Sequence, residues 1–363
     1  MSPVARRFAA LLLPALAASG TAARAQTLAV PDLAGFPLKL DRAVLFRGKE
    51  ATLGQPADMT LRPDGSICVA DPGFQRISCF QANGRLLFHS GRKGEGPGEF
   101  GFPYRIASLP DNSLAVYDVA SQSLSLLDSR GRFVRRWRLP FDFRQANGMI
   151  GLGGSLVAIA GYAPTAGRSA DSAVHVFRFD STLRHVRSFA PLPAAKDREI
   201  LEYWGAGHLS RLPGGRILYS QSIPYELFVY DASGRRHRRT GVPIRVASAP
   251  DLAFQITRDL SSFSIASTNA LVMAPGAAVE VHPRLTLVQR FAMKLGQTEE
   301  IWWDALDPAT GAVLSSVRLP PGFRIVGLTE VLPTGRSLIG MALVDDEPVL
   351  VRLDFTLRPA GRG

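Results

Sequence analysis

Polar residues at one repeated spacing are the strongest candidates for chemistry in this sequence. Each lies eight residues before the end of a predicted hairpin turn, and the four clearest are Asp58, Arg105, Asn147 and His208. The same offset gives Ser262 and, with a slip of one residue, Thr329. If the spacing reflects a structural repeat, these side chains form a ring. A guanidinium in such a ring would bind a carboxylate or phosphate, a carboxylate would bind an amine, and the amide and imidazole would offer adjustable hydrogen bonds.

Motifs for other kinds of chemistry are weak. The six histidines are dispersed without a His-x-x-x-His pair, and no Gly-x-Ser-x-Gly nucleophile elbow stands out. Two cysteines are too few for a Cys-based zinc site. The glycines between positions 91 and 98 lack the Gly-Lys-Ser/Thr of a phosphate-binding loop. Binding is therefore favoured over catalysis, and no catalytic residue is assigned.

A repeat of strands and turns would position the candidate ring. Residues 63–71 contain a turn followed by an apolar run, and residues 110–118 repeat this pattern 47 positions later. A second turn follows in each copy, at Asn83-Gly84 and at Arg130-Gly131. Such residues favour turns because they tolerate positive φ or bond their own backbone. Short β-branched and aromatic runs without helical periodicity predict an all-β chain of four-stranded blades.

This order of elements resembles the NHL-like six-bladed β-propellers, with the glycine-rich stretch 91–100 as the crossover between two blades. The resemblance covers nearly all of the chain after its first residues and is clearest in blades one and two. It implies that the ring residues begin the innermost strands, around a central channel. A wet channel mouth would also explain polar residues there without any ligand.

The resemblance leaves two functions open. The favoured one is a binding or scaffold protein that takes a small anionic or zwitterionic ligand, or a protein partner, at its channel mouth or top face. The alternative is a metal-dependent hydrolase or lyase, because lactonase-like propellers hold a channel metal with Glu, Asn and Asp. Ca²⁺ or Zn²⁺ would then be the cofactor. Arg105 departs from that pattern, since its charge repels a cation, and no cofactor is assigned.

Six blades account for most of the chain. We expect a signal peptide, a lead-in, the propeller and a tail at residues 1–25, 26–41, 42–357 and 358–363. Blade six lacks an obvious fourth strand, so residues 43–47 are expected to supply it and close the ring. Blade five is irregular, with its first turn expected at residues 268–272 and an insertion at residues 276–296. Counting that insertion as a separate blade would give a seven-bladed propeller, an interpretation that we rank below the six-bladed one.

The N-terminal segment has the features of a secretory signal. Arg6 and Arg7 precede a short apolar run, and Ala23-Arg24-Ala25 forms an A-x-A cleavage site before Gln26. The apolar run is too short to span a membrane, and no later segment resembles a transmembrane helix. We therefore expect an exported monomer, in the periplasm or secreted.

The two cysteines suit an oxidising compartment. Cys68 and Cys79 lie on consecutive strands of one predicted hairpin. If Ala70 opposes Arg76, Cys68 opposes Ser78, and Cys79 lies diagonally on the other face. One bulge between the strands would bring the two cysteines together. We predict a disulfide that rigidifies the blade.

The net charge is +11, and it falls to +8 without the three arginines of the leader. Such a charge could attract an anionic polymer, a membrane or nucleic acid. The arginines are scattered, however, and only residues 235–239 form a cluster, on a predicted hairpin. Compositional bias is the preferred explanation, and export argues against DNA as a partner.

Overall fold

The computed structural model describes residues 26–46, 48–143, 145–192, 207–212, 215–221, 226–241, 272–294, 297–310, 312–331 and 335–358. These residues form six antiparallel sheets, five of them four-stranded and one five-stranded. The only helical segments in this part of the chain are two short 3-10 turns, η1 (Lys49–Ala51) and η2 (Gly167–Ser169). The expectation of an all-β chain of six blades is confirmed.

The strands follow the chain from blade to blade. Blades one and two contain β3 (Asp58–Leu61), β4 (Ile67–Asp71), β5 (Arg76–Phe80), β6 (Leu86–Ser90), β7 (Pro103–Ser108), β8 (Leu114–Asp118), β9 (Ser123–Leu127) and β10 (Phe133–Arg138). Blades three and four contain β11 (Gln145–Gly153), β12 (Leu156–Tyr162), β13 (Ser172–Phe179), β14 (Leu183–Pro191), β15 (Gly207–Leu212), β16 (Arg216–Gln221), β17 (Glu226–Tyr230) and β18 (Arg236–Gly241). Blade five contains β19 (Val272–His282), β20 (Leu285–Lys294), β21 (Gln297–Leu306) and β22 (Val313–Arg318). Blade six contains β23 (Arg324–Val331), β24 (Ser337–Val344), β25 (Glu347–Leu357), β2 (Leu38–Leu45) and β1 (Gln26–Leu28).

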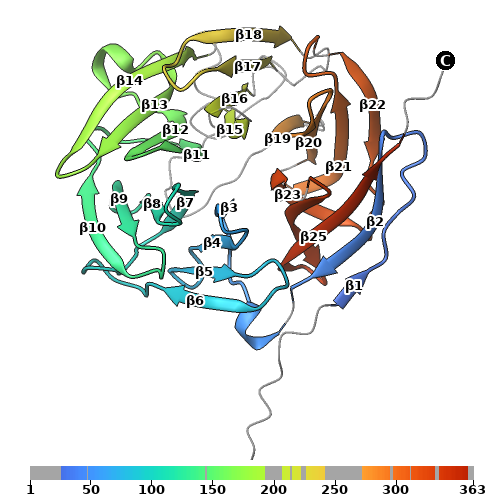
Figure 1. Ribbon diagram of the computed structural model, residues 1–363, viewed down its shortest axis with the longest axis horizontal. Helices are drawn as coiled ribbons and strands as arrows, with labels where there is room; N and C mark the ends of the chain where they lie inside the picture. The colour runs from blue at the N-terminus through green and yellow to red at the C-terminus, as the bar shows by residue number, and fades with distance from the viewer. Residues whose placement is uncertain are drawn as a thin grey trace, which may run out of the picture.

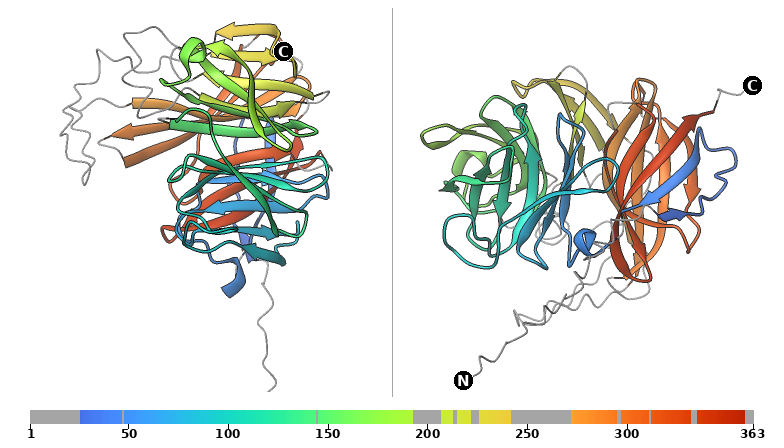
Figure 2. Two further views of the ribbon diagram at one scale, coloured as in Figure 1. Left: turned by 90° about the vertical axis from the view of Figure 1, so that its left-hand side faces the viewer. Right: turned by 60° about the horizontal axis from the view of Figure 1, so that its bottom comes forward.

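The blades are arranged around a central axis as a ring (Figure 1). The first strand of each blade lies nearest the axis, and the fourth lies at the rim. Seen from other directions, the blades stand side by side with their strands tilted against one another (Figure 2). Apolar side chains fill the space between neighbouring blades, and one buried cluster joins Ile77 of blade one to Ile106 and Val116 of blade two. This packing holds neighbouring blades together.

The N-terminal strand closes the ring, as expected, but it begins earlier than expected. β2 pairs with β25 from Leu38 to Leu45, and β1 adds a further strand outside β2. The predicted strand at residues 43–47 is therefore only partly right, and the boundary at residue 42 is too late. Residues of the expected lead-in 26–41 belong to blade six, where Leu38 and Leu40 join its apolar core.

The described residues of the expected insertion 276–296 are regular strands of blade five and not an insertion. That stretch forms most of the hairpin β19–β20, in which His282 pairs with Leu285. The first turn of the blade therefore lies at Pro283-Arg284. The expected first turn at residues 268–272 is wrong, since Val272 already belongs to β19 and the rest of that range lies outside the described residues.

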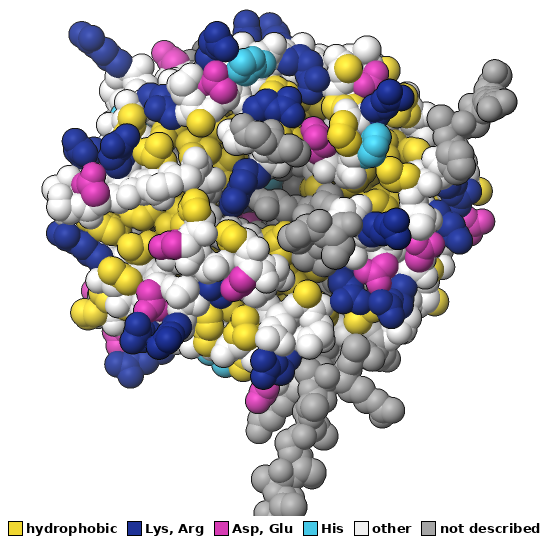
Figure 3. Space-filling model, viewed as in Figure 1, with side chains coloured by type: hydrophobic (Ala, Val, Ile, Leu, Met, Phe, Trp, Pro, Cys, Tyr) yellow, Lys and Arg dark blue, Asp and Glu magenta, His cyan; other side chains and the backbone are white. Residues whose placement is uncertain are grey.

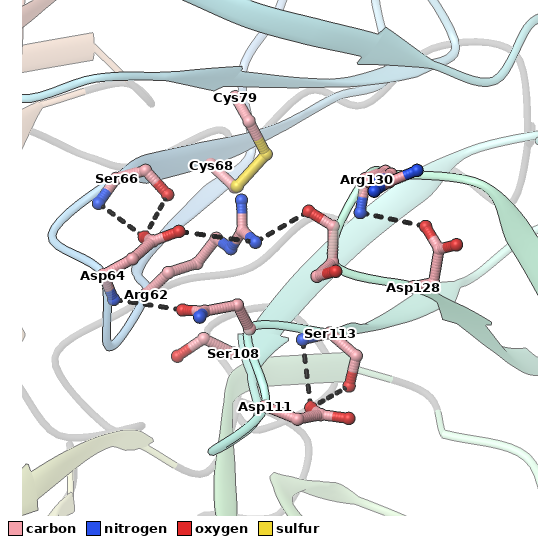
Figure 4. Close-up of polar contacts among 12 residues, drawn as sticks. Arg62, Asp64, Ser66, Cys68, Cys79, Ser108, Asp111, Ser113, Asp128 and Arg130 are labelled. Atoms are coloured by element: carbon pink, nitrogen blue, oxygen red, sulfur yellow. Dashed lines mark hydrogen bonds and ion pairs between the residues drawn. A yellow bond between two sulfur atoms is a disulfide. The ribbon is translucent and has the colours of Figure 1, made fainter.

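The first turns of blades one and two have the same hydrogen bonds. The Asp64 carboxylate accepts from the backbone N–H and the hydroxyl of Ser66, at 2.9 and 2.5 Å. Asp111 accepts in the same way from Ser113, and the two turns are joined by the Asp64 N–H donating to Asn112 at 3.0 Å. Figure 4 shows these turns together with Arg62, which donates to the carbonyl of Ser129. In both blades, the first turn is thus fixed by an aspartate that stands at the same place in the sequence repeat.

Cys68 and Cys79 form a disulfide in blade one. Asp71, not Ala70, opposes Arg76, so the two cysteines are directly opposite each other without a bulge between them. The pairing is thus shifted by one residue from the expected one, with Asp71 as the last residue of β4. The Asp71 carboxylate accepts the N–H groups of Gly54 and Gly73 at 2.8 and 3.1 Å.

Candidate functional site

The four clearest ring candidates lie on the innermost strands of blades one to four. Asp58 begins β3, Arg105 is in β7, Asn147 is in β11 and His208 is in β15. Each of these strands contacts the next one around the axis. Figure 3 shows the surface hollowed near this axis, with basic side chains beside the hollow. The regular spacing in the sequence therefore corresponds to a regular position in space.

Arg105 is the centre of this group. Its Nε donates to the carbonyl of Ala146, and its Nη1 donates to the carbonyl of Ala57, both at 2.8 Å. Nη1 also donates to the carbonyl of Tyr104 at 3.2 Å, and the guanidinium lies 3.9 Å from the Tyr104 ring centroid. The residue is only 7% exposed. Arg105 thus joins the inner strands of blades one, two and three.

This geometry corrects the role that the sequence suggested for Arg105. A guanidinium has five N–H donors, and in Arg105 three of these donors already form hydrogen bonds with backbone carbonyls. Only the Nη2 hydrogens lack a partner among the residues described. Arg105 therefore acts first as a structural bridge and a source of positive charge, and only Nη2 remains to meet an anion.

Asp58 lies beside this charge. Its Oδ2 accepts the backbone N–H of Ile106 from the neighbouring blade at 3.0 Å. Burial raises the pKa of the Asp58 carboxyl to about 6, although the nearby charge of Arg105 lowers it. Loss of water outweighs the attraction of this charge because a carboxylate is strongly hydrated. Asp58 therefore changes protonation close to neutral pH.

His208 completes the group from blade four. The pKa of its imidazole is lowered to about 4, mainly by burial and also by the positive charge of Arg105, while a hydrogen bond with the backbone of Asn147 opposes this shift. The ring is therefore neutral at pH 7, and can both donate and accept a hydrogen bond. The structure thus brings Asp58, Arg105, Asn147 and His208 together as one cluster. Their binding of a ligand stays a prediction.

For the two weaker candidates, the side chains lie outside the described part of the structure. Ser262 lies outside the described residues, and it was counted from a blade-five turn that lies elsewhere. Thr329 lies within β23, but its side chain is not described.

A second polar layer was missed by the sequence reasoning. Arg211 in β15 reaches Ser108 in β7, with Nη2 donating to the hydroxyl at 3.0 Å and to the carbonyl at 3.2 Å. The Ser108 hydroxyl in turn donates to the carbonyl of Leu61 at 2.7 Å. Blades two and four are not neighbours, so this contact spans the centre of the ring. Each of the two residues lies three positions after a ring candidate, which is roughly 10 Å further along its strand. This shared offset is the feature of the sequence from which the second layer could have been predicted.

Groups that could hold a metal were sought throughout the described residues, and no cluster of three His, Cys, Asp or Glu side chains is present among them. Likewise, no helix in the described part of the chain is long and apolar enough to cross a membrane.

Comparisons with known proteins agree with the architecture. No family model matches the chain, and no curated protein matches it. A Bacteroides fragilis protein labelled as exported has a TM-score of 0.58 at 12% identity, over 89% of this chain and 96% of that chain. A DUF4221-family member from Bacteroides vulgatus has a TM-score of 0.56 at 12% identity, over 89% and 98%. Streptogramin B lyase has a TM-score of 0.51 at 11% identity, over 86% and 97%.

At such identities the similarity shows the fold alone. Together, the six sheets and these neighbours define the chain as a six-bladed β-propeller.

Proposed function

We propose that this propeller binds a small zwitterionic ligand at the cluster of Asp58, Arg105, Asn147 and His208. The observation that supports this most is the Asp58 carboxyl, whose pKa burial raises to about 6 beside a guanidinium. A carboxylate that has lost water in this way gains more from a ligand ammonium group than an exposed one does. Strongly perturbed groups of this kind are concentrated at functional sites.

The cluster suggests how such a ligand would lie. Its ammonium group would face Asp58, and its carboxylate or phosphate would face the Nη2 hydrogens of Arg105. The neutral imidazole of His208 and the amide of Asn147 would accept or donate hydrogen bonds to the groups between. The Arg211–Ser108 contact lies deeper along the axis and would limit how far the ligand enters.

Ligand-dependent stabilisation tests this proposal. Glycine, γ-aminobutyrate and phosphoethanolamine would be screened by thermal unfolding, with acetate and ethylammonium as ligands that carry one charge only. A zwitterion at 100 times its dissociation constant stabilises the protein by about 2.7 kcal/mol. We expect Asp58→Asn and His208→Gln to lose most of this effect, and Asp346→Asn, at an exposed carboxylate of blade six, to keep it. Equal stabilisation of all variants, or none of the wild type, would reject the proposal.

The finer family assignment rests on the repeat and the N-terminal segment. We propose an NHL-like propeller that is exported, because an A-x-A site directly precedes Gln26 and β1 begins at that residue. One similar structure is itself labelled as exported. N-terminal sequencing of periplasmic or secreted material should begin at Gln26 or Thr27. An intact Met1 in a cytosolic fraction would contradict export.

A catalytic function is the alternative, and one observation favours it. Asp58 and His208 have pKa values shifted in opposite directions, as acid and base pairs often do. The carboxylate, amide and imidazole offer donors for Ca²⁺ or Zn²⁺, but the fit is poor because Arg105 brings a positive charge into the same cluster. Metal analysis of purified protein separates the two functions, since one equivalent of tightly held metal that Asp58→Asn releases would favour the enzyme.

A further inference from the structure

Arginine is concentrated on the outer strands of three consecutive blades. β10, β14 and β18 are each the last strand of their sheet, and they contain three, two and three arginines, with no aspartate or glutamate. They follow one another along the rim in Figure 1, and basic side chains lie along the same stretch of rim in Figure 3. We call these three strands the arginine rim.

Protection of exposed strand edges does not explain this pattern by itself. Charged side chains on edge strands do prevent the pairing of one molecule with another. The outer strands of the other blades contain fewer basic residues, however. β6 and β1 contain neither lysine nor arginine, β22 contains one arginine, and the part of β2 that β1 leaves unpaired contains Lys39 and Arg42. The difference between the two halves of the rim therefore points to a binding role.

Four of the eight rim arginines are available to a partner. Of the others, Arg136 and Arg187 donate to backbone carbonyls. Arg239 pairs with a glutamate. Arg135 and Arg236 are exposed, and no carboxylate of the described chain lies within ion-pair distance of either. Arg138 and Arg184 are also exposed, and each has one aspartate nearby, at 3.5 and 3.1 Å. Exposed pairs of this kind contribute little, so a polyanion can replace the aspartate without much loss.

We propose that the arginine rim binds a linear acidic polysaccharide. The rim is convex, so a flat membrane would touch one blade at a time, whereas a flexible chain can follow three. Edge strands also present unpaired backbone N–H and C=O groups. Sugar hydroxyls can both donate and accept hydrogen bonds to such groups, while carboxylates or sulfates face the arginines. A phosphodiester backbone would offer acceptors only.

Matched charge variants test the proposal. The rim variant carries Arg135→Gln, Arg138→Gln, Arg184→Gln and Arg236→Gln. The control variant loses the same charge from other blades, through Arg42→Gln, Arg85→Gln, Arg318→Gln and Arg324→Gln. Binding to fluorescent polygalacturonate and dextran sulfate would be measured over a series of salt concentrations, with neutral dextran as the blank.

We expect the wild type and the control variant to bind both acidic polymers within about twofold of each other. The rim variant should bind at least about tenfold more weakly and with a smaller dependence on salt, because fewer counterions are released. Three results would overturn the proposal: no binding by the wild type at low salt, equal loss in both variants, or tighter rim-dependent binding to phosphatidylglycerol vesicles or a thymidine oligonucleotide.

Discussion

Replacing Asp58 by asparagine should make the folded protein more stable at neutral pH and leave it almost unchanged in acid. Asparagine is a neutral mimic of the protonated carboxyl, and its amide oxygen can still accept the Ile106 N–H that Asp58 accepts at 3.0 Å. The variant therefore removes only the unfavourable free energy of ionising a carboxyl that burial has largely separated from water. The surrounding backbone contacts are kept.

The magnitude follows from the shift of the Asp58 pKa. Burial raises this pKa from 3.8 to about 6, so the folded state holds the proton more tightly than the unfolded state. Stability contributed by this carboxyl is therefore greatest below pH 4 and is lost as the pH rises through 6. A shift of two pH units corresponds to about 3 kcal/mol. Burial of Asp58 is incomplete, since the residue as a whole keeps some exposure to solvent, and screening by water reduces this figure to roughly 1–3 kcal/mol.

Urea unfolding of the wild type and Asp58→Asn at pH 4, 5, 6, 7 and 8 measures the effect. The difference in unfolding free energy should be near zero at pH 4, rise between pH 4 and 6.5, and stay constant above that. Other titrating groups contribute equally to both proteins and cancel in the difference. A difference that does not change with pH, or that favours the wild type at pH 7, would refute the assignment of Asp58 as a dehydrated carboxyl.

Three further outcomes are expected from unfolding measurements. Arg105→Ala should lose about 3–5 kcal/mol, because it leaves buried carbonyls of three blades unpaired, whereas Arg135→Ala at the exposed rim should stay within about 0.5 kcal/mol. Replacing both Cys68 and Cys79 by alanine should cost about 2–3 kcal/mol, as loss of a cross-link over a short loop does. Deleting residues 27–48 should abolish cooperative unfolding, because β25 then loses its partner β2.

For each of these predictions, one result would contradict it. A stable Arg105→Ala would show that the carbonyls find other donors. Equal stability with and without reducing agent would show that the disulfide does not cross-link the folded chain. An unchanged melting temperature in the truncated protein would show that closure by β2 is dispensable.

Features set by neighbouring residues could be predicted from the sequence. The turns of blades one and two depend on an aspartate two residues before a serine, and both stand in the sequence as the structure uses them. The spacing of the inner strands follows from those turns. For this reason, counting back from a turn placed Asp58, Arg105, Asn147 and His208 correctly at the start of successive inner strands.

Blade five shows where this reasoning fails. Its first turn consists of Pro283 and Arg284, which carry none of the usual hairpin signals. The imidazole of His282 accepts the Arg284 N–H at 3.1 Å, in the place of the aspartate used in blades one and two. Without an Asn, Asp or Gly to mark the turn, the register was counted from the wrong position, and Ser262 was chosen in consequence.

Contacts between blades could not be predicted from the sequence either. Arg105 was expected to offer its guanidinium to a ligand, but the carbonyls of Ala57 and Ala146 lie 48 and 41 residues away in the chain and take up its donors. Which groups meet across blades depends on how closely the inner strands approach one another. A single sequence carries no record of that distance.

The most direct test of the proposed site is a titration of the Asp58 carboxyl carbon by NMR, in the free protein and with whichever zwitterion stabilises it. The free protein should titrate with a midpoint near 6, set by burial. Bound ammonium should favour the carboxylate and move the midpoint below 5, because a neighbouring positive charge lowers the pKa of an acid. A midpoint that ligand leaves unchanged would contradict binding at this cluster.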